Sequence, residues 1–168
     1  PIITLISAFS AFAGNGGAPL AAIELGKSEK DSQALEQAKQ ILSNAFVMLL
    51  FFSFILTSFF LVFKNSLLMA FGASTDTLPF ASDYLGIYLI GTIFVQLSIG
   101  LNPFISSQGK AKTAMTSMLI GAILNIILDP IFIFKLKLGV KGAAIATIIS
   151  QAVSAIWILF FLTKKSTV

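Results

Sequence analysis

Residues 113–134 read TAMTSMLIGAILNIILDPIFIF, and the single charge among these 22 residues is Asp129. A helix needs about 20 consecutive, predominantly apolar residues to cross the hydrocarbon core of a bilayer, so this stretch predicts a transmembrane helix. An aspartate deep in such a helix costs roughly 2.5–3.5 kcal/mol on insertion scales, and intramembrane acids are usually functional. The stretch therefore predicts a membrane protein with a functional carboxylate.

The composition extends this interpretation to the whole chain. It is 57% hydrophobic and 11% charged, whereas soluble domains carry about 25% charged residues. We expect an all-α integral membrane protein, a multi-span helical bundle with about five transmembrane helices. The predicted spans are residues 1–25, 40–63, 84–107, 113–134 and 142–163. Residues 65–82 contain too short an uncharged run to cross the bilayer, so they predict an interfacial segment. Residues 74–79 predict a turn within it.

Several classes of function are excluded or disfavoured by what the sequence lacks. It has no cysteine and no histidine, which excludes disulfides, thiol nucleophiles and histidine metal sites. The net charge of +4 comes from lysines at the ends of spans, so we expect no nucleic-acid partner. No nucleophile and base stand at a recognisable spacing, so we expect neither an enzyme nor a bound cofactor.

The surroundings of Asp129 predict a small-cation or proton site. Asn125 precedes it by four residues, which places both side chains on one helix face. Pro130 follows directly and removes the backbone donor that would have bonded the carbonyl of Ile126. A buried acid, an amide one turn away and a loosened backbone together suit such a site.

The last hairpin adds further members to this site. Asp129 lies six residues before the loop 135–141 and Thr147 six after it, so both lie roughly 9 Å inside the loop at 1.5 Å per residue. Asn125 and Gln151 are matched in the same way, ten residues from the loop. The predicted cluster is Asp129, Asn125 and Thr147, with Gln151 nearby. The alternative is a structural clamp, in which the hydroxyl and amide satisfy a protonated carboxyl.

Two other stretches are ambiguous. Thr92, Gln96, Pro103 and Ser106 fall within about 40° of one line on a helix, which predicts a polar stripe facing the bundle interior. Its alternatives are interior packing and a substrate-lining role, so Thr92 and Gln96 join Gln151 and Pro130 as candidate cavity residues.

Residues 14–19, GNGGAP, resemble a phosphate loop only in composition. They indicate a helix that a neighbour approaches closely.

Lysine counts predict the orientation. The side formed by loops 26–39 and 108–112 and the chain end holds seven lysines, and the other side holds four. The excess of positive charge makes the first side cytoplasmic in a multi-pass protein of the cell membrane. The two sets are Lys27, Lys30, Lys39, Lys110, Lys112, Lys164 and Lys165 against Lys64, Lys135, Lys137 and Lys141.

Four segments carry a family resemblance: GGAPLAAIELGK (16–27), the turn 106–109, NIILDPIFIF (125–134) and LGVKGAAIATIISQ (138–151). In order and spacing they resemble the multidrug and toxic compound extrusion (MATE) family over essentially the whole chain. The resemblance implies a twelve-helix antiporter of two six-helix lobes that expels organic, often cationic and amphipathic, compounds in exchange for sodium ions or protons. The expected partners are the lipid bilayer and a drug-like small molecule.

The resemblance also implies site residues. In the DNA-damage-inducible branch, the cation site of the amino-terminal lobe uses an aspartate and an asparagine on the fifth helix and a threonine on the sixth. These match Asp129, Asn125 and Thr147, a possible sodium site. The chain would cover helices two to six of that lobe, so its first helix, which carries another aspartate, and the second lobe would be missing partners.

The resulting hypothesis is an antiporter lobe with Asp129 as the coupling carboxylate. Protonation or sodium binding there would bias the lobe between outward and inward arrangements. One alternative is a lipid-linked-precursor flippase of the same superfamily, although the spans contain none of the basic residues that would hold phosphates. The other is a non-transporting membrane scaffold subunit whose polar residues serve only packing.

Overall fold

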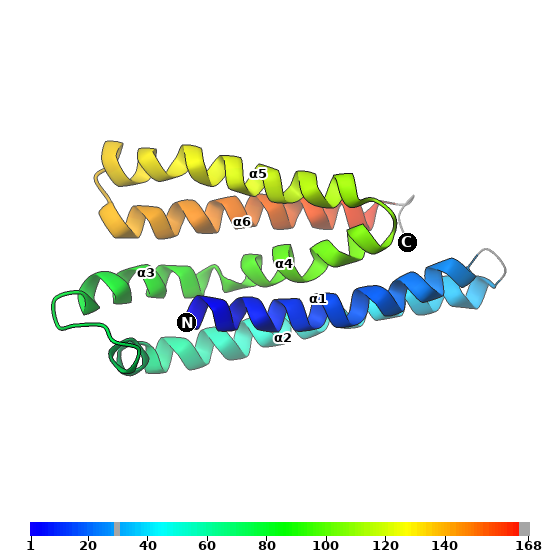
Figure 1. Ribbon diagram of the computed structural model, residues 1–168, viewed down its shortest axis with the longest axis horizontal. Coiled ribbons are helices and arrows are strands. Elements are labelled where there is room, and N and C mark those ends of the chain that lie inside the picture. Colours follow the sequence, from blue (N-terminus) through cyan, green and yellow to red (C-terminus); the bar gives the residue numbers. More distant parts are fainter. Residues whose placement is uncertain (29–30, 165–168) are drawn as a thin grey trace.

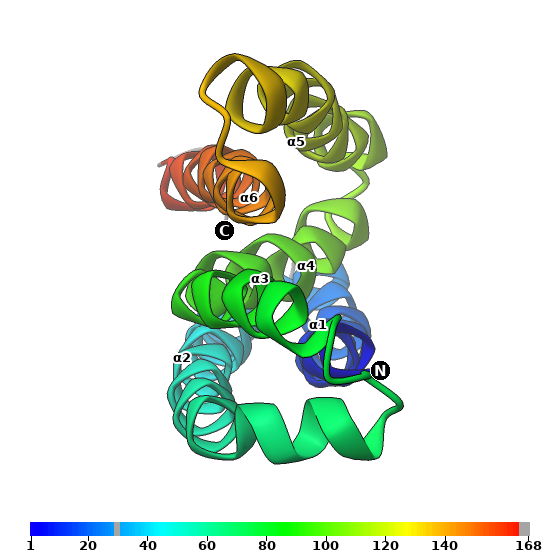
Figure 2. The same ribbon diagram turned by 90° about the vertical axis from the view of Figure 1, so that its left-hand side faces the viewer.

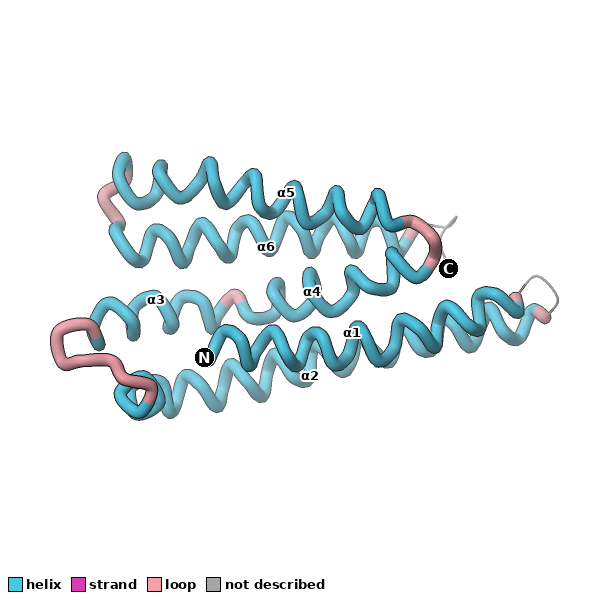
Figure 3. Tube along the Cα trace, viewed as in Figure 1, coloured by secondary structure: helices cyan, strands magenta, loops and turns pink. Residues whose placement is uncertain are grey.

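The computed structural model describes residues 1–28 and 31–164, which fold as a bundle of helices (Figure 1). Short loops join the helices, and the described residues contain no strand (Figure 3). The predicted all-α class is therefore confirmed. The elements are α1 (Ile2–Lys27), α2 (Ser32–Ala70), α3 (Leu78–Ile90), α4 (Thr92–Ser107), α5 (Ala111–Pro130), the π-helical η1 (Ile131–Lys135) and α6 (Gly139–Thr163).

Three of the described helices are long and apolar enough to cross a membrane: α2, the α5–η1 helix over Ala111–Lys135, and α6. Helices α3 and α4 together make a fourth candidate, a single span broken by a 60° bend. Helix α1 has 26 residues and is long enough to cross a membrane, but it is not among the candidate spans. Its glycines and Asn15 lower its mean hydropathy. A span over residues 1–25 thus stays a prediction.

The helices are arranged in two pairs around α4. Viewed end-on, the α5–α6 hairpin lies on one side of α3 and α4, and the α1–α2 pair lies on the other (Figure 2). Helix α4 packs against α1, α2, α5 and α6. The end of α1, the α4–α5 turn and the end of α6 lie at one end of the bundle (Figure 1). That grouping agrees with the loops predicted to share a side. Lys30 and Lys165, which enter the lysine count, lie outside the described residues.

The span predicted over 84–107 is broken at Gly91. A Cβ on Gly91 would collide with the side chain of Ile148 on α6, so a glycine is needed where the hairpin packs on the break. The bend leaves the carbonyl of Leu89 without its usual helical donor, and the hydroxyl of Thr57 on α2 donates to it at 3.0 Å. Both contacts come from distant parts of the chain, so no local pattern in 84–107 predicted the break.

The predicted interfacial segment 65–82 divides between two helices. Helix α2 continues to Ala70, and its last turns lie across the end of the bundle (Figure 2). The turn ends earlier than predicted, because Pro79 already lies in the first turn of α3, where a missing backbone donor is tolerated. Ser74 and Thr77 close the turn, with the Ser74 N–H donating to the Thr77 hydroxyl at 3.0 Å.

Close approach of helices confirms the interpretation of residues 14–19. Helix α1 runs through this segment, Pro19 included. A Cβ on Gly14 would collide with the carbonyl oxygen of Gly100 on α4, so the two backbones lie against each other there. Small residues allow this kind of packing in membrane helices. The α1–α4 contact fixes one wall of the pocket described next.

Candidate functional site

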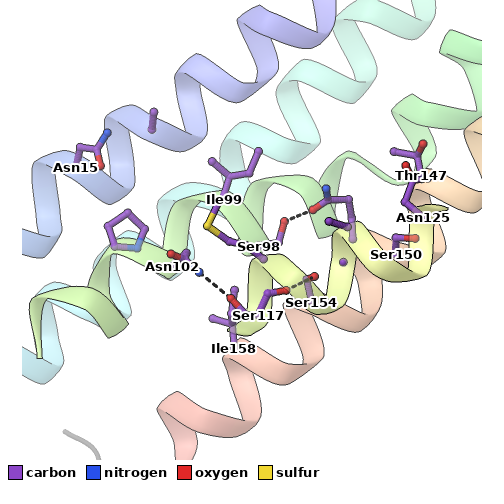
Figure 4. A pocket seen from close by; sticks show the side chains of 16 residues that line it. Asn15, Ser98, Ile99, Asn102, Ser117, Asn125, Thr147, Ser150, Ser154 and Ile158 are labelled. Carbon is purple, nitrogen blue, oxygen red and sulfur yellow. Dashed lines mark hydrogen bonds between the residues drawn. The ribbon is translucent and has the colours of Figure 1, made fainter. Parts of the chain in front are cut away.

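A pocket of about 450 Å³ opens between α1, α4, α5 and α6 (Figure 4). Its described lining contains no charged side chain. Neutral hydrogen-bonding side chains stand among apolar ones, so the wall offers both hydrogen bonds and apolar contact, as typical small-molecule sites do. The polar lining residues are Asn15, Ser98, Asn102, Ser117, Asn125, Thr147, Ser150, Gln151 and Ser154.

Asp129 is connected to this pocket through Asn125. The Asn125 Nδ2 donates to the Asp129 Oδ1 at 3.2 Å, as expected for side chains one turn apart on the same face. Asn125 lines the pocket, whereas Asp129 is half-buried and lies outside the lining. The carboxylate is therefore a neighbour of the pocket, reached through one amide.

Thr147 lines the same pocket as Asn125 (Figure 4), whereas the matched depths in the hairpin pair Thr147 with Asp129. Its hydroxyl donates to the carbonyl of Ala143 at 2.9 Å, which leaves the oxygen's lone pairs available. In the described part of the chain Thr147 makes no hydrogen bond to Asp129. Asp129 is thus hydrogen-bonded to Asn125, whereas Thr147 and Asn125 share only the lining of the pocket.

These three residues carry a carboxylate, an amide and a hydroxyl oxygen, and the structure joins only Asp129 and Asn125 by a hydrogen bond. Hard cations prefer carboxylate, amide and hydroxyl oxygens. Within residues 1–28 and 31–164 no group of three or more acidic, cysteine or histidine side chains could hold a metal. A single carboxylate with neutral oxygens matches the charge of a sodium ion or a proton better than that of a divalent metal.

Gln151, a predicted cavity residue, does line the pocket. The hydroxyl of Ser98 donates to its amide oxygen and ties α4 to α6 (Figure 4). Its partner Ser98 was missed by the sequence reasoning, which followed a stripe on α4 starting from Thr92. Polarity inside a span was the available signal, but only the contact with α6 shows that Ser98 faces inward.

A second polar tie was also missed. The Asn102 Nδ2 donates to the Ser117 hydroxyl at 2.7 Å and to the Ala114 carbonyl at 2.9 Å, which joins α4 to α5. The Ser154 hydroxyl donates to the Ser117 carbonyl at 2.9 Å and joins α6 to α5. These bonds hold three walls of the pocket together. Asn15 on α1 faces them across the pocket (Figure 4).

Three other predicted cavity residues, Gln96, Thr92 and Pro130, do not line this pocket. Gln96 is fully buried against α1, where it accepts from Ser10 at 2.8 Å and donates to the Ile6 carbonyl at 3.2 Å. The Thr92 hydroxyl is buried with no hydrogen-bond partner in the described residues.

The polar stripe on α4 does not face the interior along its whole length. Ser106, at its far end, is exposed, while Pro103 lines the pocket. Pro130 is likewise exposed and outside the lining. The helix continues through Pro130 into η1, where the Leu136 N–H donates to the Ile131 carbonyl at 2.9 Å. The wide π-helical turn thus follows Pro130, whereas the loosening predicted at the Ile126 carbonyl falls within the α-helical part of α5.

Polar pockets near intramembrane ionisable residues occur in helical secondary transporters. The chain belongs to the MatE family, whose sequence profile matches residues 1–131. It is 33% identical over 166 residues to the multidrug export protein MepA of Staphylococcus haemolyticus, which covers 99% of this chain and 36% of that protein. It is 37% identical over 109 residues to Protein DETOXIFICATION 43 of Arabidopsis thaliana, covering 63% of this chain and 21% of the relative.

Solved structures agree with this assignment. A MATE crystal structure in the bent conformation superimposes with a TM-score of 0.91 at 30% identity, over 100% of this chain and 36% of that one. An inward-facing MATE transporter of the MOP superfamily superimposes with a TM-score of 0.87 at 31% identity, over 95% of this chain and 35% of that one. An outward-facing MATE transporter of the same superfamily superimposes with a TM-score of 0.86 at 30% identity, over 96% of this chain and 35% of that one. The chain spans about a third of the length of these structures.

Proposed function

We propose that this chain is most of the amino-terminal lobe of a multidrug exporter, in which Asp129 couples export of organic compounds to the entry of sodium ions or protons. The observation that carries the proposal is the Asn125–Asp129 hydrogen bond of 3.2 Å, because it links the intramembrane carboxylate to a residue of the pocket wall. The export activity named for the MepA relative supports the substrate class.

Asn125 supplies a physical route for coupling. Its amide nitrogen now donates to the carboxylate, whereas a cation bound at Asp129 would need the amide oxygen. Cation binding therefore requires the amide to turn, which changes the donor that Asn125 presents to the pocket. A ligand shifts a conformational equilibrium only by its different affinity for the two states. In our proposal the turned amide provides that difference.

The lobe is proposed to move as a unit. This chain superimposes almost equally well on an inward-facing and an outward-facing MATE structure, with TM-scores of 0.87 and 0.86. Alternating access would then come from rocking of one lobe against the other. We place the protein in the cell membrane, with residues 26–39 (the α1–α2 connection and the first turns of α2), the 108–112 turn and the chain end on the cytoplasmic side, because the lysine excess lies on that side.

The test is the Asp129→Asn variant of the intact transporter in proteoliposomes. Substrate efflux is measured under an imposed proton gradient and, separately, an imposed sodium gradient. We expect the variant to reach the membrane and bind substrate but to lose gradient-driven efflux. Asp83→Asn is the matched control, since Asp83 is an exposed carboxylate paired with Lys141 at 3.3 Å, outside the pocket.

The outcomes separate the hypotheses. Loss of efflux in Asp129→Asn alone supports the coupling role, and the gradient that drives the wild type identifies the ion. Equal efflux in wild type and Asp129→Asn would show that Asp129 is a packing clamp. A flippase would move a lipid-linked phosphate instead, and the described pocket lining offers no basic side chain to hold one.

A further inference from the structure

A second groove, of about 430 Å³, lies between α2 and α6. Leu101 of α4 forms its floor, while the next residues, Asn102 and Pro103, line the pocket described above. The groove therefore opens on a different face of α4 from the polar pocket. In the described part of the chain the backbones of α2 and α6 do not approach each other closely, so this groove lies between the two helical pairs of the lobe.

The α2 wall of the groove changes character along its length. Lys39, Ser43 and Val47 all line it and stand four residues apart, so they form one stripe that runs from charge to hydroxyl to hydrocarbon. Val47 lies eight residues beyond Lys39, roughly 12 Å along the axis at 1.5 Å per residue. That distance is enough to pass from the headgroup region, roughly 5–8 Å thick on each side, into the hydrocarbon.

The α6 wall shows the same order. Thr163, the last residue of α6, lines the groove at the end near Lys39, and Leu162 and Leu159 follow deeper in. Both walls thus offer polar groups at the membrane surface and apolar side chains further inside. Val47 is 63% exposed and presents bare hydrocarbon.

Within residues 1–28 and 31–164, the side-chain donors of Lys39 and Ser43 at the mouth of the groove have no hydrogen-bond or ion-pair partner. Lys39 is exposed and makes no ion pair in the described residues, unlike Lys27, which pairs with Glu24 at 2.7 Å. Lys110 at the same end lies 4.9 Å over the ring of Phe161. Ser43 likewise makes no side-chain hydrogen bond among the residues described. An anionic group would complement this lysine and hydroxyl.

We propose that this groove binds an anionic phospholipid, with its phosphate at Lys39 and Ser43 and one acyl chain lying along Val47 and Leu159. The order of groups along both walls matches a phosphate, a glycerol ester and an acyl chain in turn. A transmembrane protein segment would bury Lys39 without an anion, which is costly in the membrane. The lipid fills the gap between α2 and α6 and joins the two helical pairs of the lobe.

The test uses phosphatidylglycerol and phosphatidylcholine that carry the same photoactivatable acyl chain. The intact transporter is reconstituted in vesicles with a trace of either lipid, cross-linked by light, and mapped by peptide mass spectrometry. One lysine near an anionic lipid is worth about 1 kcal/mol, so we expect phosphatidylglycerol to label the peptides containing Val47 and Leu159 about fivefold more than phosphatidylcholine.

The variants assign the effect to Lys39. Lys39→Ala should reduce labelling by phosphatidylglycerol to the phosphatidylcholine level, while Lys39→Arg should keep the preference. Lys112→Ala is the control, since it removes an equal charge from an exposed lysine at the same end of the bundle but outside the groove. Equal labelling by both lipids, or a preference that survives Lys39→Ala, would overturn the proposal. Absence of labelling by either lipid would also overturn it, since a protein segment then covers the groove.

Discussion

Gly121 of α5 packs directly against Ser154 of α6, so closely that a Cβ on Gly121 would collide with the Ser154 hydroxyl. That hydroxyl cannot turn aside freely, because it donates to the Ser117 carbonyl at 2.9 Å. The contact sets the spacing of the α5–α6 hairpin next to the pocket, since both residues line it. Gly121 is therefore a spacing residue for the site.

A double-variant experiment tests this contact. Gly121→Ala should destabilise the protein by about 1–3 kcal/mol, the usual cost of overpacking. Ser154→Ala should cost about 0.6 kcal/mol, the average for one hydrogen bond between membrane helices. The double variant should be more stable than the sum predicts, because the alanine at 154 removes the atom that collides. Thermal unfolding in detergent micelles measures all three, and strictly additive losses would contradict the account.

The break at Gly91 should depend on the hydroxyl of Thr57, which bonds the freed Leu89 carbonyl. Thr57→Val keeps the shape and removes the donor, so we expect a loss of about 0.5–1.5 kcal/mol in the free energy of unfolding. Thr57→Ser keeps the donor and should stay closer to the wild type. The comparison is made by thermal unfolding, and equal stability of the two variants would show that the bond contributes nothing.

Asn125 should set the apparent affinity for the coupling ion. A bound sodium ion would take the oxygen of the turned amide, and interactions with charged groups contribute about 1.5–3 kcal/mol, so Asn125→Ala should raise the sodium concentration for half-maximal efflux by about tenfold or more. If the coupling ion is a proton, loss of the Asn125 donor to the carboxylate should instead lower the proton concentration that is needed. The measurement is efflux by the intact transporter against sodium concentration or pH. Asn44→Ala is the control, because Asn44 is an exposed amide of α2 outside the pocket. An unchanged half-maximal concentration would place the ion elsewhere.

Gly142 should be intolerant of a side chain. A Cβ there would lie 2.7 Å from the backbone carbonyl carbon and oxygen of Phe132, and backbone atoms cannot rotate away. We expect Gly142→Ala to lower the thermal unfolding midpoint and to weaken the α5–α6 hairpin. Gly16 offers a matched control, since a Cβ at that position meets nothing within 4 Å. Gly16→Ala should be neutral or slightly stabilising, because alanine favours helix.

The hairpin was largely predictable from sequence. The spans expected over 113–134 and 142–163 correspond to Ala111–Lys135 and Gly139–Thr163. The pairing of Asn125 with Asp129 follows from the four-residue spacing on one helix. Thr147 could be matched in depth to Asp129 because only a short loop separates the two helices. Each of these inferences used only local geometry.

The α4 helix was not predictable in the same way. Gln96 and Pro103 lie in α4, beyond the break at Gly91, and both meet α1: Gln96 donates to the Ile6 carbonyl, and Pro103 lies beside Gly14. Asn102 joins the site because Ser117, fifteen residues later, accepts its hydrogen bond. Periodicity within a helix says which residues share a face, but not which neighbour that face meets.

The sequence by itself determined that the chain is a helical membrane bundle, where most of its helices run, and that Asp129 and Asn125 act as a pair. These properties depend on hydropathy and on the 3.6-residue repeat, which are local. The tertiary structure alone decided that α3 and α4 break at Gly91, that Ser98, Asn102, Ser117 and Ser154 hold the pocket walls together, and that Asp129 lies beside the pocket. Those features depend on contacts between helices far apart in sequence, where packing energy outweighs local preference.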